Sequence, residues 1–170
     1  HWKTLLLFAL LYIVFPAYLL KNAEQKINAL SGKTVGVIDL TFGFNPQRSL
    51  QMVADYSEEA RNYYASTELT IDIVYPLVYA FFFAIMLSML YRNSPCRWVN
   101  VIPFVTMLAD YLENIQIISL LKNYPQQSSN MAAMLEVIKM FKWLSFGCVI
   151  LLVLTGGVLR LSGKWKQSAA

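Results

Sequence analysis

Long apolar stretches alternate with short polar connections along this chain. Three of them cover residues 69–91, 99–121 and 131–161, and a shorter one covers residues 4–20. A helix needs about 20 apolar residues to cross the hydrocarbon core of a bilayer, so each stretch is about long enough to span a membrane. The pattern predicts an all-α protein, a bundle of four transmembrane helices that forms a single integral membrane domain over residues 1–170.

The first stretch could instead be a secretory signal that is cleaved off. Such a signal ends in small residues at both positions of an Ala-x-Ala pattern. The candidate site reads Lys21-Asn22-Ala23 and lacks the first small residue. We therefore expect a permanent membrane helix.

Residues 21–68 form the only long hydrophilic stretch. Within it Asn45 is a good N-cap, and Pro46 suits the first helical position. From residue 46 to about residue 64, apolar positions recur on one side and charged positions on the other. This pattern predicts an extracytoplasmic amphipathic helix that lies on the bundle at the membrane surface. Residues 35–44, which include two glycines, are predicted to be a loop.

Composition agrees with a membrane protein. Hydrophobic residues make up 57% of the chain and charged residues 14%, whereas soluble domains average about 45–50% and about 25%. The formal charge is +4, but the basic residues are dispersed, so no nucleic-acid partner is expected.

Basic residues beside the spans predict the orientation. Cytoplasmic flanks are enriched in Lys and Arg, and long loops count less than short ones. Although residues 21–68 also hold basic residues, we expect both termini to be cytoplasmic. The residues that favour this orientation are Lys3, Arg92, Arg97, Arg160, Lys164 and Lys166.

Six ionisable residues lie inside the predicted spans. Each Asp, Lys or Arg at the centre of a membrane helix costs about 2.5–3.5 kcal/mol, so such side chains face the bundle interior and find partners. The six are Asp72, Asp110, Glu113, Glu136, Lys139 and Lys142.

Helical spacing places these residues on three faces that can converge. Residues three or four positions apart share a helix face. The spacing predicts a polar, acidic chamber in the outer half of the bundle. Its faces are Asp72, Tyr75 and Tyr79 on the second span, Asp110, Glu113 and Asn114 on the third, and Glu136 and Lys139 on the fourth.

The basic side chains are expected to neutralise part of this acidity. Lys139 is the predicted partner of Glu113 or Asp110, while Lys142 or Arg61 is the predicted partner of a second carboxylate. Because the acids outnumber the lysines, one carboxylate is expected to be protonated, to recruit Arg61 or to hold a cation. The candidate ligand-binding residues are Arg61, Asp72, Tyr75, Tyr79, Asp110, Glu113, Asn114, Glu136, Lys139 and Lys142.

Such a chamber favours binding of a small amphiphile, a lipid-like molecule or a cation, because ionisable groups inside a membrane are functional candidates by default. The plain alternative is that the polar residues only join helices, at about 0.6 kcal/mol per hydrogen bond. Two further functions stay open: an enzyme that uses Glu113 or Asp110 as general acid or base on a lipid-like substrate, and an accessory subunit of a membrane complex.

Membrane lipids are expected partners, and a homo-oligomer stays open. A transporter is disfavoured because four helices without a visible repeat suit alternating access poorly.

Several chemistries lack their residues. No His lies within a span, so His-based zinc or haem sites are not expected, and no metal or cofactor is predicted. Cys96 and Cys148 are isolated and form no redox pair. No nucleotide-binding or nucleophile-elbow motif is present.

Two segments, Asp72-Ile-Val-Tyr-Pro76 and Asp110-Tyr-Leu-Glu-Asn114, resemble an uncharacterised group of bacterial four-helix integral membrane proteins. The resemblance covers about residues 44–143. It implies the bacterial inner membrane as the location, and it implies no activity. The residues that it includes are Arg61, Tyr64, Asp72, Pro76, Asp110, Glu113, Asn114, Lys142 and Trp143.

In layout the chain also resembles the EXPERA group, which includes the sigma-2 receptor and the emopamil-binding sterol isomerase. Arg97-Trp98 and Tyr75-Pro76 look alike, whereas the His of the isomerase's catalytic pattern has no counterpart in the spans. By analogy the resemblance implies binding of a lipid-like amine or a sterol, and it argues against isomerase chemistry.

Overall fold

The computed structural model describes residues 2–162, which contain helices and no strand. The first long helix consists of α1 (Trp2–Val14), a π-helical turn η1 (Phe15–Leu20) and α2 (Lys21–Ser31). It is followed by the short α3 (Pro46–Asp55) and by α4 (Glu58–Leu90). A 3-10 turn, η2 (Arg97–Val101), leads into α5 (Ile102–Lys122), and α6 (Ser129–Leu161) completes the described chain.

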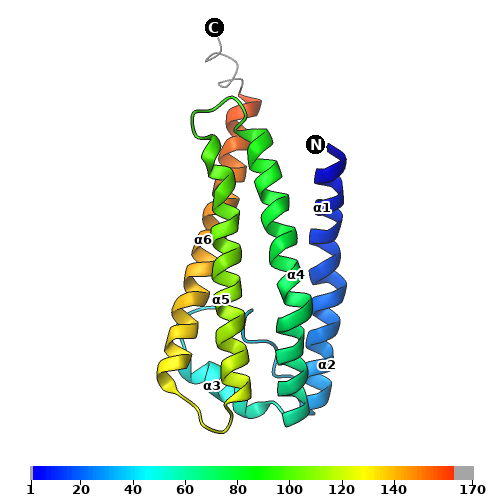
Figure 1. The fold of residues 1–170 in the computed structure, drawn as a ribbon, viewed down its shortest axis with the longest axis vertical. Coiled ribbons are helices and arrows are strands. Elements are labelled where there is room, and N and C mark those ends of the chain that lie inside the picture. Colours follow the sequence, from blue (N-terminus) through cyan, green and yellow to red (C-terminus); the bar gives the residue numbers. More distant parts are fainter. Residues whose placement is uncertain (1, 163–170) are drawn as a thin grey trace.

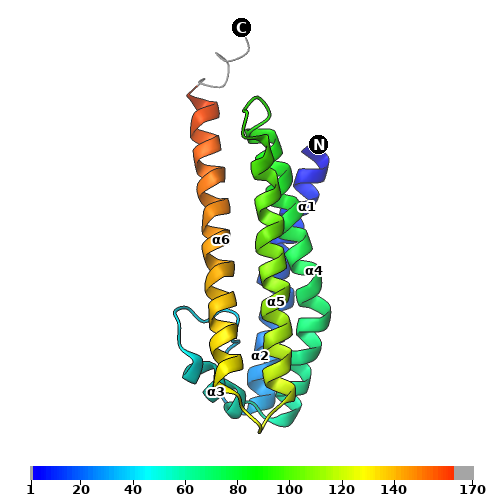
Figure 2. The same ribbon diagram turned by 60° about the vertical axis from the view of Figure 1, so that its left-hand side comes forward.

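Four of these helical stretches are long and apolar enough to cross a membrane, which confirms the predicted all-α class and the predicted number of candidate spans. The helices α4, α5 and α6 pack against one another, and α1 packs against α4. Figures 1 and 2 both show α1 and α6 standing apart. The start of α1, the 91–96 connection and the end of α6 lie at one end of the bundle, and α3 lies at the other (Figure 1).

The structure corrects the predicted boundaries of the polar stretch. The amphipathic helix predicted over residues 46–64 is interrupted, because α3 ends at Asp55 and Tyr56 has an extended backbone. Ser57 then caps α4 by accepting a hydrogen bond from the Ala60 amide. Residues 58–68 are therefore the first three turns of the second long helix and not part of a loop. Asn45 caps α3 as predicted, and residues 35–44 form the predicted loop.

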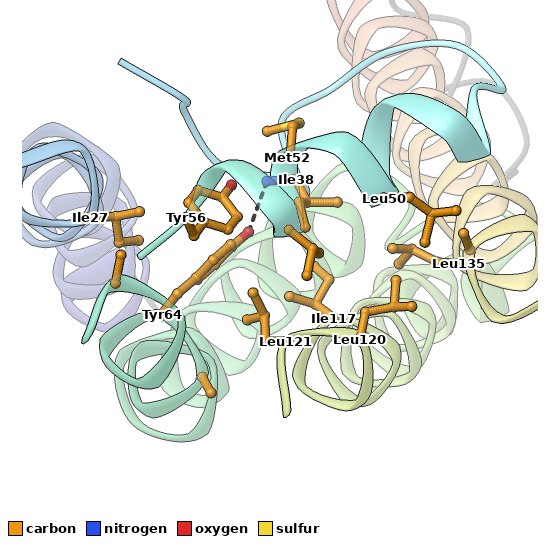
Figure 3. Packing of buried hydrophobic residues seen from close by; sticks show 14 residues of the cluster. Ile27, Ile38, Leu50, Met52, Tyr56, Tyr64, Ile117, Leu120, Leu121 and Leu135 are labelled. Carbon is orange, nitrogen blue, oxygen red and sulfur yellow. Dashed lines mark hydrogen bonds between the residues drawn. The ribbon is translucent and has the colours of Figure 1, made fainter. Parts of the chain in front are cut away.

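A buried apolar cluster joins α3 to the ends of the long helices. Side chains from α2, the 32–45 segment, α3, α4, α5 and α6 meet in it (Figure 3). The Tyr64 hydroxyl accepts a hydrogen bond from the Ile38 amide at 2.9 Å. The neighbouring Tyr56 donates to the Gly36 carbonyl oxygen, and burial raises the pKa of its phenol above the ordinary range. These phenols fix the 32–45 segment to the bundle.

A second apolar cluster closes the opposite end, where Gly156 of α6 meets the end of α4. A Cβ atom at Gly156 would lie 2.6 Å from Cε2 of Tyr91 and 3.2 Å from Cβ of Leu90. The Tyr91 hydroxyl donates to the Leu152 carbonyl oxygen at 2.9 Å, which holds the ring in place. The absence of a side chain at Gly156 therefore permits this helix contact.

We expect Gly156→Ala to lower the free energy of unfolding by about 1–3 kcal/mol, the usual cost of overpacking a filled contact. Denaturant titration in detergent, followed by circular dichroism, measures this loss. Gly157→Ala is the matched control, because a Cβ there has no heavy atom within 4 Å. Equal stability losses in the two variants would contradict the prediction.

Candidate functional site

A cavity of about 480 Å³ lies between the first long helix and α6. The first helix contributes residues between Tyr12 and Ile27, and the loop contributes residues 37, 39 and 40. The α4 helix contributes residues between Tyr64 and Tyr79, and α5 and α6 complete the wall. The cavity thus occupies the half of the bundle that carries α3.

The wall combines acidic groups with aromatic rings. Carboxylates outnumber lysines by five to two on its surface. Aromatic side chains from three helices supply much of the remaining wall. The carboxylates belong to Glu24, Asp39, Glu68, Asp72 and Asp110, the lysines are Lys21 and Lys142, and the rings include Tyr12, Tyr75, Tyr79, Trp143 and Phe146.

Lys142 pairs with two carboxylates of α5. Its Nζ lies 3.3 Å from Oδ1 of Asp110 and also forms an ion pair with Oε2 of Glu113. Tyr79 donates a hydrogen bond to the other Asp110 carboxylate oxygen at 2.8 Å. All four side chains are buried. The charge of Lys142 is therefore already shared between two acids of the protein.

This pairing corrects the predicted one, in which Lys139 served Glu113 or Asp110. Positions 139 and 142 are three residues apart on α6, and both face inward. The register between α5 and α6 places Lys142 opposite the two acids, whereas Lys139 contacts Glu136 on its own helix at 2.7 Å. Sequence spacing identifies the inward face but does not set this register.

The two buried carboxylates of α4, Glu68 and Asp72, have fewer partners. Asn114 donates to Oδ2 of Asp72 at 3.1 Å and to the Asp72 main-chain oxygen at 3.2 Å. Glu68, one turn before Asp72, is 2% exposed, and its Oε2 has no hydrogen-bond partner among residues 2–162. The buried hydroxyl of Thr106 also lacks such a partner in the described chain, and both residues line the cavity.

Glu136 and Lys139 form a separate buried cluster that holds the loop. Glu136 accepts hydrogen bonds from the Ser49 hydroxyl at 2.6 Å and from the Asn45 amide at 3.2 Å. Lys139 donates to the Thr41 hydroxyl at 2.6 Å. The pair thus fixes residues 41–49 to α6, next to the loop residues that line the cavity.

Nine of the ten predicted site residues fall into three groups. Asp72, Tyr75, Tyr79, Asp110 and Lys142 line the cavity, whereas Glu113 and Asn114 lie behind its wall and contact the residues that line it. Glu136 and Lys139 hold the loop.

Arg61 is the exception among the predicted residues. It donates to the main-chain oxygens of Val53 and Tyr56, and its guanidinium lies 4.1 Å from the centre of the Tyr124 ring. It lies outside the cavity wall and pairs with no carboxylate of the described spans. Of the two predicted partners of a second carboxylate, Lys142 and Arg61, the structure therefore shows Lys142.

Sequence reasoning missed Glu68 and Asp39. Glu68 was assigned to the hydrophilic stretch, although its spacing of four residues from Asp72 places both on one helix face. Asp39 accepts a hydrogen bond from Tyr64 at 2.7 Å and lies in an irregular segment, where no periodicity could indicate its position.

Comparison with known proteins supplies no relative for this chain. No protein family, curated protein or solved structure matches it. The two resemblances stated from the sequence therefore stay predictions, and the function has to be argued from the geometry of the cavity.

Proposed function

We propose that this membrane protein binds a small amphiphile that carries a positively charged group, and that the cavity is the binding site. The observation that carries the proposal is the buried Glu68 carboxylate, which has an oxygen without a hydrogen-bond partner in the described chain and lines the cavity. A buried carboxylate without a partner is costly, so a cationic ligand group at this position would be stabilised.

The charge balance of the wall supports a cation over an anion. Lys142 is shared between Asp110 and Glu113, so it has little capacity left for an anionic ligand. Asp72 is held by the neutral amide of Asn114. Of the three buried carboxylates of the wall, Glu68, Asp72 and Asp110, only Asp110 forms an ion pair with a lysine in the described chain.

The size and the apolar part of the wall support an organic ligand over a bare metal ion. Small-molecule sites have volumes of about 300–1,000 Å³ and are mostly apolar with a few polar groups, and this cavity fits that description. Within residues 2–162, no three His, Cys, Asp or Glu side chains are grouped so that they could hold a metal ion. A ligand with an ammonium group could place that group beside Glu68 and its apolar part among the aromatic rings of the wall.

An enzymatic role for Glu113 has less support than binding. Glu113 lies behind the cavity wall and forms an ion pair with Lys142, so a ligand in the cavity does not contact it directly. A general acid or base must come within hydrogen-bond reach of the proton that it transfers. Asp110 lines the cavity, but it is already bound by Tyr79 and Lys142.

The same proposal includes the predicted orientation, with both termini in the cytoplasm. Arg92, Arg97 and Arg160 flank the end of the bundle where α1 begins and α6 ends (Figure 1). Lys164 and Lys166 were counted with them, but lie outside the described residues. Under the positive-inside rule this end is cytoplasmic, and the cavity then lies in the outer half of the bundle, consistent with the proposed inner-membrane location.

The proposal is tested by binding two probes of equal chain length to the protein in lipid nanodiscs. We expect saturable binding of dodecylamine and much weaker binding of dodecanol, because only the amine carries a charge for Glu68. Glu68→Gln should weaken amine binding roughly 10-fold or more, since a hydrogen bond to a charged group contributes about 1.5–3 kcal/mol. Isothermal titration calorimetry measures the affinities.

Glu59→Gln is the matched control for the binding test. Glu59 lies on the same helix but is exposed at its outer end, so its loss should leave amine affinity unchanged. Amine binding that is equally tight in Glu68→Gln and in the parent protein would contradict the role of Glu68. Absence of saturable binding for both probes would contradict the proposed function itself.

A further inference from the structure

The loop between α2 and α3 exposes large apolar side chains. Residues 40–46 read Leu-Thr-Phe-Gly-Phe-Asn-Pro and contain no charge. Leu40 is 54% exposed, Phe42 69% and Phe44 54%. Three such side chains in so short a segment are unfavourable in water and favourable in contact with another apolar phase.

The segment rises along the bundle instead of staying beside α3. Figures 1 and 2 show it leaving the end of α2, rising alongside α6 toward the middle of the bundle and then descending into α3. The ring of Phe42 packs on Trp143 of α6 with 4.7 Å between the ring centres. Trp143 lies 14 residues into α6, about 20 Å from its first turn at 1.5 Å per residue.

The length of α6 sets the depth of this contact. The helix has 33 residues, and about 20 of them suffice to cross the hydrocarbon core. Counted back from Arg160 near its end, those residues extend to about residue 141, so Trp143 and the Phe42 ring lie at the outer edge of the hydrocarbon region. The exposed side chains of α6 at this level are Met140, Phe141 and Leu144, all apolar. The apolar surface of α6 therefore continues onto the loop.

Protein groups bind the loop's backbone on both sides of residues 40–44, and within that segment the Thr41 amide donates to the Ile38 carbonyl oxygen at 3.0 Å. Irregular backbone at membrane depth is tolerated where protein groups satisfy its polar atoms. Side chains of α2, α4 and α6 accept hydrogen bonds from loop amides, and Lys139 binds the Thr41 hydroxyl. The amides and their acceptors are Val35 and Gly36 to Asn28, Ile38 to Tyr64, and Asn45 to Glu136.

We propose that residues 40–44 insert into the outer leaflet of the membrane, where Leu40, Phe42 and Phe44 contact lipid. The partner is lipid and not a second copy of the chain, because the segment continues the lipid-facing surface of a membrane-spanning helix. Leu40 also lines the cavity, so the outer leaflet reaches the cavity wall. This inference concerns the loop and the bilayer, and it holds whether or not the cavity takes the ligand proposed above; only the name of the leaflet rests on the proposed orientation.

The test places a fluorescent label on single cysteines in the full chain, reconstituted in phosphatidylcholine vesicles. Cys96→Ser and Cys148→Ser first remove the exposed native thiols. Bimane is then attached at Phe42→Cys, and its quenching by spin-labelled lipid and by aqueous iodide is compared. Leu144→Cys on the apolar face of α6 is the lipid reference, and Gln47→Cys on the exposed face of α3 is the water reference.

We expect the ratio of lipid quenching to iodide quenching at Phe42→Cys to approach that at Leu144→Cys and to exceed that at Gln47→Cys several-fold. Phe44→Cys is the second variant, because it leaves the contact between Phe42 and Trp143 in place. It should give the same quenching ratio even if Phe42→Cys disturbs the loop. Quenching like that at Gln47→Cys at both positions would overturn the proposal. Protection from both quenchers would also overturn it, because it would indicate that protein covers the segment.

Discussion

Replacing Lys142 with methionine is expected to lower the free energy of unfolding by about 3–5 kcal/mol, the usual cost of removing one partner from a buried ion pair. The structure gives the reason directly. Lys142 contacts both Asp110 and Glu113, and all three side chains are buried between α5 and α6. Without the lysine, two carboxylates would face each other in a setting with little water. Denaturant titration in detergent micelles measures the loss.

The control for this prediction removes all three charges together. Asp110→Asn and Glu113→Gln, combined with Lys142→Met, leave neutral side chains of similar size. This triple variant should recover much of the lost stability, since replacing a whole buried ion group by neutral residues is often close to neutral in free energy. If Lys142→Met alone were as stable as the parent protein, the ion group would contribute nothing to the fold.

Replacing Lys139 with methionine is expected to cost a similar amount, about 3–5 kcal/mol, and to release the loop as well. Glu136 would then remain buried without its cation, and Thr41 would lose the hydrogen bond that fixes it to α6. Hydrogen exchange should therefore become faster over residues 38–50, whereas exchange in the contacts between α4 and α5 should change little. The faster exchange in the loop separates this prediction from the one for Lys142. In the described structure Lys142 forms no hydrogen bond or ion pair with the loop.

Lys122→Met is the matched control for Lys139→Met. Lys122 lies in the last turn of α5, is exposed and makes no ion pair within the described part of the chain. Its replacement removes the same charge from the surface and should alter neither stability nor exchange in the loop. Unchanged exchange over residues 38–50 in Lys139→Met would contradict the role of the cluster.

Hydropathy alone is sufficient to predict the four long helices, because a bilayer imposes a minimum apolar length that few other structures satisfy. Helical spacing likewise places Asp110, Glu113 and Asn114 on one buried face, as the structure confirms. These are properties of single helices. They depend on the backbone geometry of one segment and need no knowledge of its neighbours.

Contacts between helices were harder to predict. The partner of Asp110 depends on how far α6 is shifted along α5, and the spacing on α6 allows either Lys139 or Lys142 to be that partner.

Glu68 was missed for a different reason. The polar residues before it lower the local hydropathy, although Ser57 followed by two glutamates is a good helix start that extends α4 back to Glu58. Capping residues were the signal that could have found it.

The π-helical turn η1 has a mechanical consequence for the first long helix. Pro16 lies in this turn, and its nitrogen cannot donate the hydrogen bond that a regular helix would make there. Both Pro16 and Tyr12, one turn earlier, line the cavity. The ladder of hydrogen bonds is thus interrupted at the level of the cavity, where a helix bends more easily than in a regular stretch. A bend at this turn would change the width of the cavity, because the opposite walls belong to α4, α5 and α6, which pack against one another.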